Sequence, residues 1–222
     1  MLLIGASQVE YDLGMPDGRP LTATSFAILG LLAVRPWPTY ELAKQIGRSL
    51  SHFWPRAESN LYAEAKRLVA GGYAVARQEK DGERRRTVYR ITPQGRKALR
   101  EWLETPGGEV RLESEPLLKV FFADQGGKAN LLDTLRAMGA AAETQQAMLR
   151  RMAEEYRAGG GPFPERLAVG VLALGLVWEY LEATVAWSRR AVEAVDKWQK
   201  PGPGEEPMWP EGIFSKASRS KP

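Results

Sequence analysis

Residues 73–92 read YAVARQEKDGERRRTVYRIT, and this stretch decides the fold of the first half of the chain. Two runs with β-strand character flank Asp81-Gly82, a dipeptide that favours the two-residue turn of a β-hairpin. Three arginines, Arg84, Arg85 and Arg86, follow the turn after one intervening residue, Glu83. Because neighbouring like charges repel each other, the pattern favours a hairpin tip that faces an anionic partner. A solvated tip without a partner is the alternative.

Side-chain alternation distributes these cations over the two faces of the hairpin. Successive side chains point to opposite faces of a strand, so Arg84 and Arg86 are expected on one face and Arg85 on the other. Arg77 and Lys80 lie on the preceding strand and add two further cations. The three arginines are therefore expected to make unequal contacts with any partner.

Two helical patterns begin the first half of the chain. Residues 21–34 carry apolar side chains at helical spacing, with Thr22 or Thr24 as the N-cap. A shorter helix is expected to begin at Thr39, as its N-cap. Its spacing places three side chains in the core: Tyr40, Ala43 and Ile46.

A third helix is expected from about Ser59 to the Gly71-Gly72 pair, directly before the hairpin. Its core stripe comprises Leu61, Ala65 and Leu68. The opposite face carries Asn60, Ala63, Glu64 and Arg67. Two helices followed by a hairpin in this order are typical of a helix-turn-helix with a wing.

A fourth helix follows the hairpin, because Thr92-Pro93 combines an N-cap residue with proline at the first helical position. Its buried stripe is expected to be Leu99, Trp102 and Leu103. The order helix, helix, helix, hairpin, helix predicts a mainly α protein with an N-terminal winged helix-turn-helix.

The second half of the chain contains two long helical runs separated by GGGPFP at residues 159–164. Apolar residues in both runs alternate steps of three and four, which is a coiled-coil-like heptad pattern. The seam of the second run, assigned to dimerisation, includes Leu167, Val171, Leu174, Trp178, Leu181 and Val185. A second apolar stripe runs beside it, so we infer that a second subunit covers it and that the protein is a homodimer. A self-sufficient hairpin within one chain is the alternative.

Composition restricts the possible functions. The 222 residues include no cysteine and one histidine, which excludes disulfides and any thiolate or multi-histidine metal site. No nucleophile–base pair or phosphate-binding glycine loop is recognisable, so we expect no enzyme, no catalytic or metal-binding residue and no cofactor. The opening apolar run is too short for a signal peptide, and no run reaches about 18 consecutive apolar residues. We therefore expect a cytoplasmic protein without a membrane partner.

The charge is distributed unequally along the chain. Residues 21–105 carry 15 Lys and Arg against 8 Asp and Glu, a net charge of +7, whereas the whole chain carries +4. Charge asymmetry of this kind suggests an anionic partner for one domain. Four segments are predicted: an N-terminal extension (1–20), a winged-helix DNA-binding domain (21–105), a helical dimerisation domain (106–200) and a flexible tail (201–222).

The quoted motifs resemble the PadR family of bacterial transcriptional regulators, in its longer form with a C-terminal helical dimerisation domain. Four blocks carry the resemblance in the expected order: LTATSFAILGLLA, TYELAKQI, SNLYAEAKRLVAGGYAV and RRRTVYRITPQGRKALREWL. In the C-terminal half, EPLLKVFFAD is the nearest motif. The resemblance implies a homodimeric repressor that binds a pseudo-palindromic operator in double-stranded DNA.

The third helix is then expected to read the major groove. Ser59 and Asn60 stand at its N-terminus, where phosphates and base edges can approach, and an Asn amide can bond adenine at two points. Tyr62 and Lys66 could supplement these contacts. Arg67 has two interpretations, a DNA contact or an ion pair with a carboxylate of the same domain.

The resemblance also suggests a small aromatic effector that releases the repressor. Trp178, Tyr180 and Trp187 are the ligand candidates, because aromatic walls suit flat apolar molecules. Aromatic residues at heptad spacing are, however, commonly core residues. The competing function is a winged-helix adaptor that binds protein without specific DNA binding.

Overall fold

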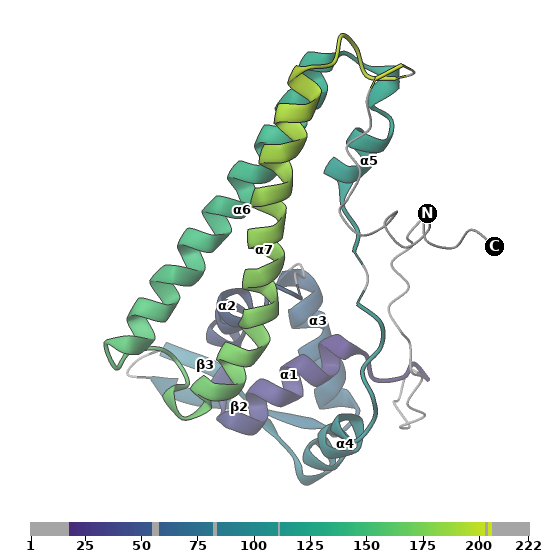
Figure 1. Cartoon of the computed structure of the whole chain (residues 1–222). Coiled ribbons are helices and arrows are strands. Elements are labelled where there is room, and N and C mark those ends of the chain that lie inside the picture. Colours follow the sequence, from purple (N-terminus) through teal and green to yellow (C-terminus); the bar gives the residue numbers. More distant parts are fainter. Residues whose placement is uncertain (1–17, 55–57, 82–83, 111, 203, 206–222) are drawn as a thin grey trace, which may run out of the picture. The chain divides into compact units, whose positions relative to one another are not determined.

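The computed structural model describes residues 18–54, 58–81, 84–110, 112–202 and 204–205 (Figure 1). The chain folds into two compact units, Met1–Leu112 and Glu113–Pro222. The division falls somewhat later than the boundary that the sequence suggests at residue 105. Of the predicted Asp81-Gly82 turn, Gly82 lies outside the described residues, whereas Asp81 ends a strand and pairs with Arg84. Most of the N-terminal extension and most of the tail also lie outside the described residues.

The first unit is a winged helix-turn-helix, as the sequence predicts. Its three-stranded antiparallel sheet has the order β1-β3-β2, with β3 in the centre. The elements in chain order are α1 (Ala23–Val34), β1 (Trp37–Pro38), α2 (Thr39–Ser49), α3 (Glu58–Ala70), β2 (Ala74–Asp81), β3 (Arg84–Ile91) and α4 (Pro93–Leu103).

Helix α1 forms the centre of this unit. Thr22 caps it: the Ser25 amide donates to Thr22 Oγ1 and the Thr22 amide donates to Ser25 Oγ, which is a reciprocal capping box. Its buried apolar side chains are Phe26, Ile28, Leu29, Leu31 and Leu32. The ring of Phe26 stacks on Trp102 of α4 at a centroid distance of 4.8 Å. The helix is thus covered by neighbours on several sides.

Strand β1 was not predicted, because its sequence Trp37-Pro38 reads as a break between helices. It pairs with the central strand through Trp37 opposite Tyr89. The Trp37 side chain is buried and its Nε1 donates to the Leu31 carbonyl at 2.9 Å. The chain therefore leaves α1 by joining the sheet, and α2 starts from this strand.

Two side chains predicted for the core lie at the surface. Tyr40 is 69% exposed, because α2 buries Leu42, Ala43 and Ile46 and these residues turn Tyr40 outward. Leu103 is 66% exposed at the last residue of α4, which packs through Ala98 and Gly95 instead. Thr39 is the first residue of α2 and not its cap; its hydroxyl donates to the Thr87 carbonyl of β3.

Gly95 allows α4 to pack closely against the start of the hairpin. A Cβ atom at this position would lie 2.2 Å from the carbonyl oxygen of Tyr73, a backbone atom that cannot move aside. The predicted Thr92 cap is confirmed, since its hydroxyl accepts from the Gly95 amide at 3.0 Å. The cap and the glycine together hold α4 at the base of the wing.

The second unit consists of α5 (Glu115–Phe121), the 3-10 helix η1 (Ala123–Gln125), α6 (Lys128–Arg157), the 3-10 helix η2 (Pro164–Arg166) and α7 (Leu167–Asp196). The helices α6 and α7 are each 30 residues long and lie side by side (Figure 1). Two apolar clusters join them. One is built on Leu131, Leu132, Leu135, Ala191 and Val195, and the other on Ala142, Leu149, Leu181 and Val185.

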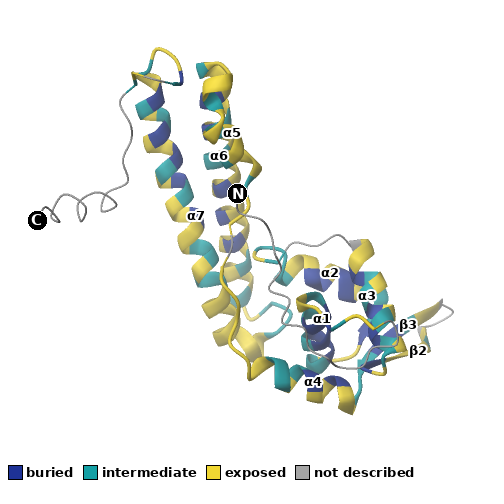
Figure 2. Cartoon of the chain, turned by 90° about the vertical axis from the view of Figure 1, so that its right-hand side faces the viewer, coloured by how far each residue is buried: buried dark blue, intermediate teal, exposed yellow. Residues whose placement is uncertain are grey.

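The two halves of α7 differ in exposure. The half that ends at Asp196 contributes the buried residues Leu181, Val185, Ala191 and Val195 (Figure 2). From Leu167 to Tyr180 no residue is buried, and Leu172 is 79% exposed. Its exposed apolar side chains are Leu167, Val169, Val171, Leu172, Leu176 and Tyr180. Intrachain packing therefore leaves this apolar face uncovered.

The segment Pro164–Asp196 is also long and apolar enough to cross a membrane by length and composition, with a mean hydropathy of 1.5 and 11% of its most apolar window buried. The sequence-based count of consecutive apolar residues did not detect this, because Glu179 and Glu182 interrupt the run while leaving the average high. The buried core helix of a soluble protein passes the same test, so one such helix is weak evidence for a membrane span.

Two glycine substitutions are expected to have opposite effects on stability. Gly95→Ala forces a Cβ against the Tyr73 carbonyl and is expected to lower the free energy of unfolding by about 1–3 kcal/mol. Gly30→Ala in α1 places a Cβ in open space and is expected to raise it by about 0.5–1 kcal/mol. Urea unfolding followed by circular dichroism measures both, and a Gly95→Ala protein as stable as the parent would contradict this packing.

Candidate nucleic-acid interface

Helix α3 is fixed by its inner stripe, which leaves its opposite face at the surface. Leu61, Ala65 and Leu68 are all buried, as predicted. The residues that the helical period places on the other side, Ser59, Asn60, Ala63 and Lys66, are exposed, and Tyr62 is half-buried. The predicted contact residues of α3 therefore share one helix, although they do not all point in one direction.

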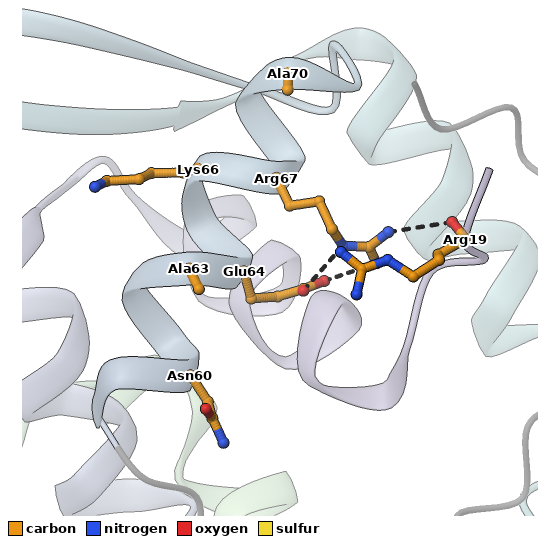
Figure 3. A pocket seen from close by; sticks show the side chains of 7 residues that line it. All are labelled: Arg19, Asn60, Ala63, Glu64, Lys66, Arg67 and Ala70. Carbon is orange, nitrogen blue, oxygen red and sulfur yellow. Dashed lines mark hydrogen bonds and ion pairs between the residues drawn. The ribbon is translucent and has the colours of Figure 1, made fainter. Parts of the chain in front are cut away.

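An open hollow of about 520 Å³ lies along the outward face of α3 (Figure 3). Its lining residues are Arg19, Asn60, Ala63, Glu64, Lys66, Arg67 and Ala70. Three cations and one carboxylate among them leave the hollow with a net charge of +2. Because Ala63 and Ala70 have small side chains, a flat or convex polyanion could approach the helix backbone closely here.

Arg67 makes the ion pair that was one of its two interpretations. Its Nη2 and Nε donate to the Glu64 carboxylate, both at 3.0 Å. The Ser25 hydroxyl, from α1, donates to the same carboxylate. The side chains of Arg67 and Glu64 are only 11% and 14% exposed. This pair is consequently part of the packing between α3 and the beginning of α1.

The register of the hairpin separates its cations into two groups. Lys80 stands directly opposite Arg85, and residues directly opposite share a face of the sheet. On the other face Glu79 stands opposite Arg86, and Asp81 opposite Arg84. Glu79, which is ion-paired with Arg90, thus places a negative charge beside Arg86, whereas Lys80 and Arg85 bring two positive charges together.

Other cations and an aromatic residue extend this surface. Arg77 is exposed on β2, while Arg90 is paired with Glu79 at 2.8 Å. Tyr40 lies in the first turn of α2, the helix that crosses the phosphate backbone in helix-turn-helix proteins. Sequence reasoning missed Tyr40 because its apolar ring was assigned to the core. It also missed Arg19, which was assigned to an extension without a role.

The three ligand candidates do not form one group. Trp178 packs on the cluster around Leu149, with the Arg150 guanidinium 5.1 Å from its ring centroid. Trp187 packs on the other cluster of the α6–α7 pair, and Tyr180 is 50% exposed. Within the described parts of the chain, no group of three or more His, Cys, Asp or Glu residues could hold a metal ion.

Each of the two units matches the model of a known protein family. The model of the transcriptional regulator PadR-like family matches residues 28–101, and the model named virulence activator alpha C-term matches residues 114–196. The first unit carries a PadR-like domain. The match confirms the predicted resemblance to PadR regulators and the predicted mainly α fold with a winged helix-turn-helix. The PadR-like family is one of transcriptional regulators and not of enzymes.

The relatives of this PadR-like chain include the negative transcriptional regulator PadR of Bacillus subtilis, which is 30% identical over 100 residues. That alignment covers 44% of this chain and about half, 54%, of the relative. The crystal structure of the B. subtilis PadR in complex with operator DNA has a TM-score of 0.64 at 23% identity, covering 78% of this chain and 98% of that one.

A second structural neighbour is the virulence activator AphA of Vibrio cholerae, with a TM-score of 0.60 and 20% identity. It covers 78% of this chain and 98% of its own. A PadR-like regulator of Bacillus cereus has a TM-score of 0.66 at 20% identity, with the same coverage. At these identities the likeness establishes the fold of both units and not their ligands.

The wing offers a direct test of the charge pattern. Lys80→Gln and Arg85→Gln are each expected to lower DNA affinity and to reduce the slope of log affinity against log salt by about 1 per lost phosphate contact. Arg86→Gln is expected to change the slope less, because Glu79 stands opposite Arg86. Fluorescence anisotropy at several salt concentrations measures all three. Equal slopes for the three variants would contradict the separation into two groups.

Proposed function

We propose that the protein is a homodimeric transcriptional regulator that binds double-stranded DNA as a repressor. The observation that carries the proposal is the outward face of α3, lined by three cations and one carboxylate, in the same unit as the Lys80–Arg85 pair of the wing. The B. subtilis relative is named as a negative regulator, and its crystal structure contains operator DNA. Both support repression through an operator. The function places the protein in the cytoplasm.

Helix α3 has the dimensions to act as the reading element. A helix with side chains is about 10–12 Å across, which matches the width of about 12 Å of the major groove. The proposed base contact is Asn60, with Ser59, Tyr62 and Lys66 around it. If each subunit neutralises about three phosphates, the dimer is expected to show a salt slope near −5.

The exposed face of α7 supports the homodimer. Of the predicted dimerisation residues, Leu174, Trp178, Leu181 and Val185 pack in one chain against α6, whereas Leu167 and Val171 are exposed. The free apolar surface therefore centres on the neighbours of the predicted seam, Leu172, Leu176 and Tyr180. We assign it to a second copy and not to a membrane, because Glu179 and Glu182 lie in the middle of the helix. A dyad would set two α3 helices at half-sites about 34 Å apart in a pseudo-palindromic operator.

A small aromatic effector remains part of the proposal. A crystal structure of the B. subtilis PadR contains p-coumaric acid, which is a flat aromatic carboxylic acid. An effector that releases the repressor needs a coupling free energy of only about 1–3 kcal/mol. The adaptor function is not favoured, since the lining of the α3 hollow carries a net positive charge and a crystal structure of the B. subtilis relative contains operator DNA.

The DNA-binding proposal is tested with a duplex from the promoter region upstream of the protein's own coding sequence. Footprinting is expected to protect two half-sites, and anisotropy is expected to show tighter binding than to a scrambled duplex of equal length. Weak and equal binding of both duplexes would overturn sequence-specific regulation and favour the adaptor.

The dimer is tested by placing charge on the free face of α7. The double substitution Leu172→Glu, Leu176→Glu is expected to shift the protein to monomers in sedimentation, because two carboxylates would be buried in an apolar interface. Val110→Glu is the matched control, since Val110 is 89% exposed in the segment between α4 and α5. If the double variant still forms a dimer, the dimer interface does not lie on this face of α7. If the parent protein is released from a membrane fraction only by detergent, the result favours membrane insertion of α7.

A further inference from the structure

Arg67 holds the chain segment that precedes α1. Its Nη1 donates to the Arg19 carbonyl at 3.1 Å and its Nη2 to the Pro20 carbonyl at 3.0 Å. These acceptors lie 48 and 47 residues away in sequence, and both belong to the segment that leads into the Thr22 cap. With the two bonds to Glu64, one largely buried guanidinium therefore ties the backbone at residues 19–20 to α3.

These bonds leave Arg67 poorly suited to contact DNA. A guanidinium has five N–H groups in a rigid fork, and Arg67 directs them to a carboxylate and two carbonyl oxygens within its own unit. Turning it toward a phosphate would leave the Glu64 carboxylate, 14% exposed, without its cation. Breaking a buried ion pair in this way is costly. The role that the geometry gives Arg67 is to position its neighbours.

The residue that is positioned is Arg19. It lines the hollow on the outward face of α3 together with Lys66, and Figure 3 shows the two side chains on opposite sides of the helix. Ala63 and Ala70 lie between them, so the ridge of the helix is low where the rims are cationic. Figure 3 shows the Arg19 guanidinium beside the Arg67–Glu64 pair, so these three groups together carry one net positive charge, and Lys66 adds a second across the helix.

This arrangement matches the cross-section of a major groove. The groove is bounded on both sides by a phosphate backbone, and a helix lying in it presents one flank to each. We propose that Arg19 is a further DNA-binding residue, which contacts the phosphate backbone opposite to the one that Lys66 faces, and that Arg67 is its positioning residue. The inference rests on the proposed function, because it requires α3 to enter DNA.

The experiment compares Arg19→Gln, the paired substitution Glu64→Gln with Arg67→Met, and all three together, in the full chain. The pair removes the clamp without leaving an uncompensated carboxylate. Arg151→Gln, on the exposed surface of α6, is the control for the loss of one positive charge. Salt-dependent anisotropy on the operator duplex and on a scrambled duplex gives affinity and slope, and circular dichroism with urea unfolding checks that each variant is folded.

Arg19→Gln is expected to weaken binding to both duplexes by about eightfold per subunit at 0.1 M salt and to reduce the slope by about 2 for the dimer. The clamp variant is expected to show the same loss, and the triple variant no further loss, because both changes act through Arg19. The control is expected to bind like the parent.

Three results would overturn the inference. If Arg19→Gln behaves like Arg151→Gln while the parent binds its operator, Arg19 makes no contact. If the clamp variant binds like the parent, Arg67 does not position Arg19, and if the losses add in the triple variant, Arg67 contacts DNA itself. Failure of the parent protein to bind any duplex would instead contradict the proposed function, so the two failures are distinguishable.

Discussion

The winged-helix unit depends on the enclosure of α1. This helix is apolar around most of its circumference, with five large buried side chains, and α2, α3, α4 and β3 all contact it. Full burial of one such side chain contributes roughly 1.5–3 kcal/mol. Because Leu61, Ala65 and Leu68 direct α3 toward this core, the opposite face of α3 has to point to solvent. The surface assigned to DNA is thus a consequence of how α1 is covered.

Local signals in the sequence were sufficient for the main elements. The two strands about Asp81-Gly82, the Thr92-Pro93 helix start and the period of α3 each depend on neighbours within a few residues, and all three predictions are confirmed. Strand β1 could not be predicted in this way, since it exists only through the pairing of Trp37 with Tyr89. The side chain of Tyr40 was misplaced for the same reason, because β1 sets the start of α2.

The candidate site follows the same division between local and distant contacts. The helical period of α3 suffices to place Asn60 and Lys66 at the surface. It cannot show that Arg67 is occupied, since the carbonyl oxygens that it binds are 47 and 48 residues away. The position of Glu79 opposite Arg86 also needs the strand register, which the arginine run alone does not contain. The charge composition of the sequence is therefore sufficient to predict an anionic partner, but it is not sufficient to predict which cations are already paired within the protein.

The different exposure of the two parts of α7 relates the proposed DNA contacts to the proposed homodimer. α6 covers the half that carries Leu181 and Val185, and the half with Leu172 and Leu176 keeps an apolar face exposed. A single winged-helix unit neutralises few phosphates, so its binding to DNA would be weak at physiological salt. Joining two copies through α7 would make the second contact intramolecular and raise the affinity without any new contact type. A modest cationic surface on each winged-helix unit would then be sufficient for DNA binding. In this proposal the apolar face of α7 and the charge of α3 both contribute to DNA affinity.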